Sequence, residues 1–306
     1  MAEKKMNRWV AYLVTMVAIV LWGMSYLWSN ALIRQGIPVE YFLFLRIILA
    51  GIMLLVFNLV MGYSIQVRLA DLNMFALLAL CEPLVYFFCE TYGIKFTESP
   101  TYSALIIATT PIFALIAGVV FFHEKMSKMN ILGVGICLAG LVFVTWYSSG
   151  VGKAFILGAL LLLIAVFAEV GQAVYTKVLA DRSYAPSVIV MYQFFFGSVY
   201  LLPFFLARGV VDFDPALYLS WDVIRPLLCL ALLCSSLAFT CWASAVKNLG
   251  VARSSIFQAM IPVVTALVGF ILGQERLSLL QWTGIFVACI GLVLTQMGSG
   301  KAKPGA

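Results

Sequence analysis

The sequence predicts an all-α integral membrane protein in which ten transmembrane helices form two inverted five-helix repeats. Three observations lead to this fold class: the composition, the number of apolar segments and an internal duplication. Hydrophobic residues make up 64% and charged residues 10% of the 306 residues, whereas soluble domains have about 45–50% and about 25%. A chain with so few polar residues cannot cover its surface for water, so we expect lipid around it.

Ten segments are long and apolar enough to cross a bilayer, which requires about 20 predominantly apolar residues. The expected spans are residues 9–29, 39–60, 72–92, 99–121, 128–147, 155–178, 185–206, 223–245, 252–272 and 279–297. Short polar connections separate them, and the longest, residues 207–222, contains the turn-forming residues Gly209, Asp214 and Pro215. Little chain is left for a soluble domain.

One stretch occurs twice without a gap. Residues 103–142 align with residues 254–293 at an offset of 151, and ten of the 40 positions are identical. The identical pairs include Pro111/Pro262, Gly118/Gly269, Glu124/Glu275, Ser127/Ser278, Gly133/Gly284 and Gly140/Gly291. Apolar composition alone does not readily place these residue types in register, so we interpret the match as an internal duplication.

Each copy describes two helices joined by a short turn. Ser278 followed by Gln281 is a capping-box pattern for the second helix, and Ser127 with Asn130 is a weaker version. The paired glycines lie seven residues apart on one helix face, where a neighbouring backbone can approach closely. We therefore expect each copy to form a tight helical hairpin.

The loop charges predict that both termini are cytoplasmic. With the N-terminus inside, 12 Lys and Arg residues fall in inner segments and 6 in outer segments, while Arg46 lies within a span. The duplication superposes helices four and five on helices nine and ten, so the repeat has five helices. Because five is odd, the second copy is inverted in the membrane. Glu124 then stands on an inner turn and Glu275 on an outer one, and we interpret both as structural.

We expect the repeats to cover residues 9–147 and 155–297. Inverted repeats are typical of secondary transporters, because two related halves can exchange conformations around a central site.

The chain resembles the drug/metabolite transporter superfamily, specifically its EamA-type ten-helix members. The resemblance depends on Trp22-Gly23, Arg46, residues 111–124 with their copy 262–275, and the paired glycines, and it covers residues 9–297. It implies a carrier of the inner (cytoplasmic) membrane, often an exporter of amino acids or other small metabolites, with a cavity between the halves. Glu82-Pro83 and Glu90 are not part of this general signature.

The third span carries two acids. Tyr86 and Glu90 follow Glu82 at i+4 and i+8, which predicts one shared helix face. Pro83 removes a backbone donor and frees a carbonyl group, so we expect a local break that faces a cavity or a polar helix. Charge within hydrocarbon is costly, which makes Glu82 a candidate for binding a proton or a substrate ammonium group. The alternatives are a structural Glu82 paired with a buried arginine, and a Glu90 that reaches water near the outer end.

Arg46 is the only cation deep in a span. Its planar guanidinium group suits a substrate carboxylate. A structural salt bridge to Glu82 or Glu90 is the alternative, and both interpretations remain open.

Further candidates lie on other spans. Glu169 and Gln172 share a face of the sixth span with Thr176, and Trp22 and Ser25 form a similar stripe in the first. The full set of substrate-binding or coupling candidates is Glu82, Arg46, Tyr86, Glu90, Glu169, Gln172, Trp22, Ser25, Trp242 and Gln258. For the aromatic members, packing or contact with lipid is the alternative.

The leading hypothesis is a secondary transporter that exports amino acids or related zwitterions by alternating access. A zwitterion needs one cation and one anion near the midplane, and Arg46 and Glu82 supply them. Efflux of cationic drugs through Glu82, Glu90 and Glu169 is the first alternative. A carrier of nucleotide sugars or phosphate esters would need several cations, which disfavours it. Proton coupling and the oligomeric state stay open.

Other classes of protein are disfavoured. The sequence has no paired His, no Cys cluster and no Gly-rich nucleotide loop, so we expect no enzyme activity, no cofactor and no metal site. All seven Cys fall within expected spans, so we expect no disulfide. No basic cluster with interleaved aromatic residues accompanies the net charge of +6. The expected partners are therefore a small-molecule substrate and the lipid bilayer, not nucleic acid.

Overall fold

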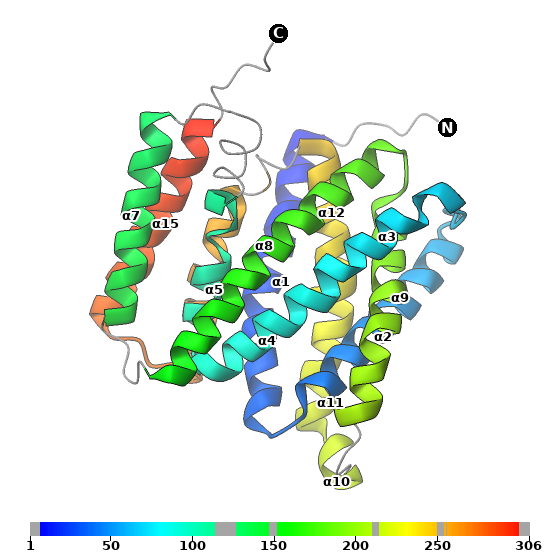
Figure 1. The fold of residues 1–306 in the computed structure, drawn as a ribbon, viewed down its shortest axis with the longest axis horizontal. Coiled ribbons are helices and arrows are strands. Elements are labelled where there is room, and N and C mark those ends of the chain that lie inside the picture. The colour runs from blue at the N-terminus through cyan, green and yellow to red at the C-terminus, as the bar shows by residue number, and fades with distance from the viewer. Residues whose placement is uncertain are drawn as a thin grey trace.

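The computed structural model describes residues 7–113, 127–146, 152–209, 214–249, 254 and 256–299. All regular secondary structure in these residues is helical (Figure 1). The α-helices are α1 (Arg8–Arg34), α2 (Val39–Val60), α3 (Leu72–Ala79), α4 (Tyr86–Thr97), α5 (Pro100–Ile107), α7 (Lys128–Trp146), α8 (Lys153–Asp181), α9 (Pro186–Phe204), α10 (Pro215–Tyr218), α11 (Trp221–Leu228), α12 (Ala238–Leu249), α14 (Ile261–Ile271) and α15 (Leu279–Ser299). Short 3-10 or π-helical segments adjoin them: η1 (Leu69–Asp71), η2 (Leu80–Val85), η3 (Phe205–Gly209), η4 (Cys229–Leu237) and η5 (Ile256–Met260).

Six helical stretches in the described residues are long and apolar enough to cross a membrane. They are Trp9–Arg34, Val39–Val60, Leu69–Thr97, Lys153–Asp181, Pro186–Arg208 and Trp221–Leu249. Three shorter apolar helices, Lys128–Val144, Phe257–Ile271 and Leu279–Thr295, coincide with the fifth, ninth and tenth expected spans. The fourth expected span begins with α5, and its residues 114–121 lie outside the described part of the chain, as does Glu124. The all-α membrane fold is confirmed, whereas the count of ten and the inversion remain predictions.

Local sequence signals set several helix ends. α2 has the predicted bounds, whereas α1 continues past its predicted end to Arg34. The capping boxes are confirmed. Ser278 N donates to Gln281 Oε1 at 2.9 Å and Gln281 N donates to Ser278 Oγ at 3.2 Å. Ser127 and Asn130 exchange the equivalent bonds at 2.8 and 3.2 Å.

The paired glycines join α7 to α15, which run side by side (Figure 1). A Cβ atom added to Gly133 would lie 2.4 Å from Thr295 N, and one added to Gly291 would lie 2.3 Å from Cys137 N. Only glycine therefore lets the two main chains approach this closely, which confirms the predicted role of these residues. The expected tight hairpin is wrong for the second copy, because α15 packs mainly on α7 and only slightly on α14. In the first copy, residues 114–126 lie outside the described part of the chain, so its hairpin remains a prediction.

The third expected helix is interrupted at Pro83, as predicted. η2 joins α3 to α4, and within it Glu82 has an extended backbone with φ −149° and ψ 123°. The carbonyl group of Glu82 accepts a 2.9 Å hydrogen bond from Gln193 Nε2 of α9. Gly197, also in α9, makes room for the proline ring, because an added Cβ would lie 2.2 Å from Pro83 Cγ. α9 thus accommodates the break, because it bonds the Glu82 carbonyl group and leaves room for the proline ring.

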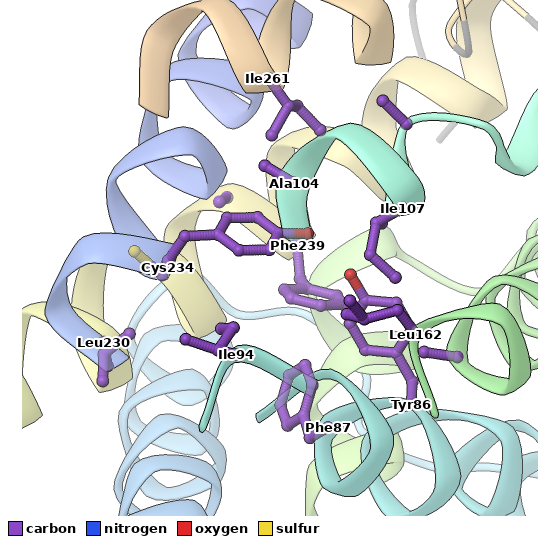
Figure 2. Packing of buried hydrophobic residues seen from close by; sticks show 14 of the residues in the cluster. Tyr86, Phe87, Ile94, Ala104, Ile107, Leu162, Leu230, Cys234, Phe239 and Ile261 are labelled. Carbon is purple, nitrogen blue, oxygen red and sulfur yellow. The ribbon is translucent and has the colours of Figure 1, made fainter. Parts of the chain in front are cut away.

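The other long helices surround the middle of the molecule. α1 contacts α12 and α14, α4 contacts α8, and α2 contacts α9. One large cluster of buried apolar side chains runs between them. Figure 2 shows part of it, in which Phe87, Ile107, Phe239 and Ile261 come from four different helices. Side chains far apart in the sequence therefore meet around one central space.

Candidate functional site

The candidate residues meet at a central cavity. Nine of the ten line it: Trp22, Ser25, Arg46, Glu82, Tyr86, Glu90, Glu169, Gln172 and Trp242. The tenth, Gln258, is buried and donates a 2.6 Å hydrogen bond from Nε2 to Oε1 of the lining residue Glu169. Both expected repeats contribute to the lining. The geometry brings the whole set together, and the role of each residue stays a prediction.

Glu82 is the acid of the cavity without a hydrogen-bonding partner. Its side chain is 3% exposed, and its carboxylate accepts no hydrogen bond from the described residues. The predicted helix face shared with Tyr86 and Glu90 is wrong, because the backbone of Glu82 is not helical. All three nevertheless line the same cavity. A buried carboxylate without a donor is costly, so Glu82 is available to a proton or a cationic group.

The other two carboxylates are held by neutral donors. Tyr86 donates its hydroxyl to Glu90 Oε1 at 3.0 Å. Glu90 does not lie at the outer surface in this conformation, because its side chain is 5% exposed and lines the cavity. Glu169 accepts from Thr110 Oγ1 at 2.5 Å and from Gln258. These bonds fix both acids in place and leave Glu82 as the distinct member of the three.

Arg46 is the buried cation of the cavity, with 2% exposure. Its Nε donates to Ser235 Oγ at 2.7 Å, and its Cζ lies 4.1 Å from the centre of the Phe87 ring. No acid among the described residues forms an ion pair with it, so the structural salt bridge to Glu82 or Glu90 is not formed. Nη1 of Arg46 is buried without a partner in the described part of the chain. A ligand acceptor can therefore bind there.

Aromatic rings form one wall of the cavity. The Trp22 ring centre lies 5.1 Å from that of Phe239 and 5.2 Å from that of Trp242. The buried indole Nε1 of Trp22 also lacks a partner among the described residues. The lipid-facing alternative is wrong for both tryptophans, because both line the cavity.

Sequence reasoning missed several lining residues. Tyr26, Phe87, Ile107, Phe239 and Ile261 also line the cavity, and Figure 2 shows the last four in the packed interior. A usable signal existed for two of them. Tyr26 follows Trp22 by four residues, and Phe239 precedes Trp242 by three, which is the spacing of one helix face.

The cavity is narrow in this conformation. The space inside it that the centre of a water molecule can occupy is only ≈ 20 Å³. Because a single water needs about 10–15 Å³ by this measure, there is space for about one water. A small metabolite can enter only after helices or side chains move. The lining residues offer charged groups, hydrogen-bonding groups and aromatic faces, all of which can bind a small molecule.

Metal binding has no support in the described residues, where no group of three His, Cys, Asp or Glu side chains is placed to hold an ion. The cysteines there are free thiols.

Comparisons with known proteins cover nearly the whole chain. A model described as the EamA-like transporter family matches residues 9–146 and 156–297. The uncharacterized inner membrane transporter YedA of Escherichia coli (strain K12) is 27% identical and covers 93% of this chain and 90% of its own length. The uncharacterized transporter YetK of Bacillus subtilis (strain 168) is 26% identical, over 97% of this chain and 89% of its own length.

Two further matches differ in kind. A protein named as a probable amino-acid metabolite efflux pump of Escherichia coli (strain K12) is 21% identical over 93% of this chain and 94% of its own length. A solved crystal structure superposes with a TM-score of 0.69 and covers 96% of this chain and 97% of that chain at 16% identity. The likeness to the crystal structure shows a common fold.

Proposed function

This chain belongs to the EamA-like transporter family, and from that premise we propose that it exports amino acids or related zwitterions across the cytoplasmic membrane. The relatives named above are transporters rather than enzymes. The proposed mechanism is alternating access, in which two inverted five-helix repeats, residues 9–147 and 155–297, rearrange around the central cavity. Both termini are proposed to be cytoplasmic, from the distribution of loop charge.

The observation that carries the proposal is an acid and a cation in one narrow cavity, each with polar atoms that lack a hydrogen-bonding partner among the described residues. Glu82 accepts no hydrogen bond from the described residues, and Nη1 of Arg46 has no acceptor there. An amino acid presents an ammonium and a carboxylate group a few ångströms apart, so it can satisfy both with charge-assisted bonds. The buried indole N–H of Trp22 is a second free donor for the carboxylate. Leaving such buried groups unpaired is costly, and a bound zwitterion relieves that cost.

Irregular segments at related positions of two spans support the inverted-repeat mechanism. η2 interrupts the third span at Glu82, and η4 is a continuous π-helical stretch of the eighth span. The offset of 151 carries residues 80–85 onto residues 231–236, which lie within η4. Discontinuous helices commonly form the substrate site of secondary transporters, and the third span is discontinuous here. Here η2 supplies Glu82 and η4 supplies Ser235, the partner of Arg46.

One relative supports the substrate class, because its name describes efflux of amino-acid metabolites. A specific observation also favours a second candidate, efflux of cationic drugs, since three carboxylates and one arginine line the cavity. A carrier of phosphate esters is less well supported, because Arg46 is the single cation among the lining residues and several cations suit a phosphate dianion better.

Counterflow in proteoliposomes tests the substrate class. Liposomes with the full-length protein are loaded with one unlabelled solute, and the uptake of its radiolabelled form is compared with protein-free liposomes. We expect exchange of one or more neutral amino acids, weaker exchange of the same molecule with its carboxyl group amidated, and none of a sugar phosphate. Exchange of a quaternary ammonium cation without exchange of any amino acid would replace this proposal with the cation alternative.

A further inference from the structure

Glu275 connects two distant parts of the chain at one end of the molecule. It lies on the turn between α14 and α15, and its side chain is 9% exposed. The sequence places Glu275 on a turn as a structural residue, and in the structure its carboxylate bonds to the start of α5. It accepts from Ser99 Oγ at 2.8 Å, from Thr101 N at 3.2 Å and from Thr101 Oγ1. The contact joins the first family-matched stretch to the second.

This contact depends on the helix end and not on an opposite charge. Ser99 caps α5 by accepting a 3.2 Å bond from Tyr102 N, and the first N–H groups of a helix have no intrahelical acceptors. A negative charge is stabilised at such a helix end. No cation in the described residues forms an ion pair with Glu275. Moving α5 away would therefore leave the carboxylate without donors until water replaced them.

The two joined segments both lead into the central cavity. α5 lines it with Ile107, and α14 lines it with Ile261. α5 and α14 also pack on each other. The contact of Glu275 fastens the first residues of α5 to the turn that follows α14. This end of the cavity cannot open between these two helices while the contact persists.

We propose that Glu275 is a positioning residue of the transport cycle, which holds one end of the cavity closed by binding the N-terminus of α5. Release of α5 opens that end, and rebinding closes it again. The loop charges predict that this end faces the outside of the cell. The inference rests on the proposed function, because it takes the central cavity as the path of the substrate.

Thiol labelling measures this closure without any knowledge of the substrate. Ser25→Cys introduces a thiol of similar size at the cavity, in a full-length chain whose seven native Cys are replaced by Ser or Ala. A charged, membrane-impermeant thiol reagent is applied to intact cells and, separately, to inside-out vesicles. Glu98→Cys, at the exposed residue beside Ser99, reports which preparation presents the Glu275 end to the reagent.

We expect Glu275→Gln to raise the labelling rate of the cavity thiol about tenfold from the Glu275 face, the effect of losing one charge-assisted hydrogen bond. Thr101→Val should act in the same direction, because it removes a donor and keeps the shape. Glu98→Gln is the matched control, since it removes the same charge from the exposed residue beside Ser99, at the other side of the contact, and it should leave the rate unchanged. Melting temperatures in detergent establish that each variant is folded.

Three outcomes would overturn the inference. Unchanged labelling in folded Glu275→Gln and Thr101→Val would mean that Glu275 only stabilises the fold. An equal increase in labelling from both faces would indicate a general loosening of the protein, and it would have the same meaning for Glu275. If Glu275→Gln does not fold, Thr101→Val decides the matter. A cavity thiol that reacts in no variant from either face would contradict the central path, and with it the proposed function.

Discussion

Replacement of Glu82 by Gln tests the centre of the proposed site. Glu82→Gln keeps the size of the side chain but removes its charge and its titration. No equivalent acid exists in the second half of the chain. When this part of the two halves is aligned with one residue more than the offset of 151, Glu82 matches Cys234. The Sγ atom of Cys234 donates to Leu21 O at 3.0 Å. An acid needed only for folding would be expected in both halves. Glu82 is therefore either a binding group for ammonium or the carrier of a coupling proton.

The structure sets the size of the effect. The Glu82 carboxylate is buried and accepts no hydrogen bond from any described residue, so a bound ammonium group would be its main partner. A hydrogen bond to a charged group contributes about 1.5–3 kcal/mol, and every 1.4 kcal/mol changes affinity about tenfold. Glu82→Gln should then bind an amino acid about 10- to 100-fold more weakly. If Glu82 carries the proton instead, affinity should be retained and only proton-driven accumulation should be lost.

Two measurements on the same proteoliposomes separate these cases. Counterflow reports binding and translocation, and accumulation under an imposed pH gradient reports coupling. Loss of counterflow indicates that Glu82 holds the ammonium group, whereas counterflow without accumulation indicates that it carries the proton. Glu98→Gln, an exposed acid remote from the cavity lining, is the control. If Glu82→Gln exchanges and accumulates solute as the parent does, Glu82 is structural and our assignment of the site is wrong.

Three other predictions test the packing, the cation and the topology. Gly140→Leu should lower the yield of folded protein, because an added Cβ would lie 2.5 Å from a main-chain nitrogen of α15, whereas Gly135→Leu on the same helix should not, since no atom lies within 4 Å; equal monodisperse yields in size-exclusion chromatography would contradict this. Arg46→Lys should weaken counterflow of an amino acid about tenfold but spare its amidated analogue, because one ammonium cannot replace the forked guanidinium group; an equal loss for both would exclude a carboxylate role. Reporter fusions at Asp181 should be cytoplasmic and fusions at Asp214 external, and the reverse pattern would overturn the orientation.

Features that depend on neighbouring residues could be predicted from the sequence. Pro83 predicts the interruption of its helix because proline cannot continue the hydrogen-bond ladder. The pattern of Ser278 and Gln281 predicts a helix start because its bonds are local. The spacing of Gly133 and Gly140 predicts a close approach, but it carries no information about the partner. For that reason α15, rather than the preceding helix of a hairpin, could not be identified as the partner of α7.

The membership of the site was predictable for a different reason. A polar side chain within an apolar span avoids lipid and faces the interior, so Glu82, Arg46 and Glu169 converge. The choice of partner was not predictable. Arg46 binds Ser235, which is 189 residues away, although Glu82 and Glu90 are more obvious partners by charge. Lining residues such as Phe87 were missed because nothing in the sequence separates them from the other 22 of the 23 phenylalanines.

The glycine contact between α7 and α15 also has a consequence for biosynthesis. α7 is complete at Trp146, and α15 begins at Leu279, 133 residues later. At about 5–20 residues per second, the ribosome needs roughly 7–27 s to make that interval. During this time α7 lacks the main-chain contacts that α15 later makes, and lipid cannot supply them. A chain cut short before Leu279 therefore leaves α7 without its partner, even when the spans before it are complete.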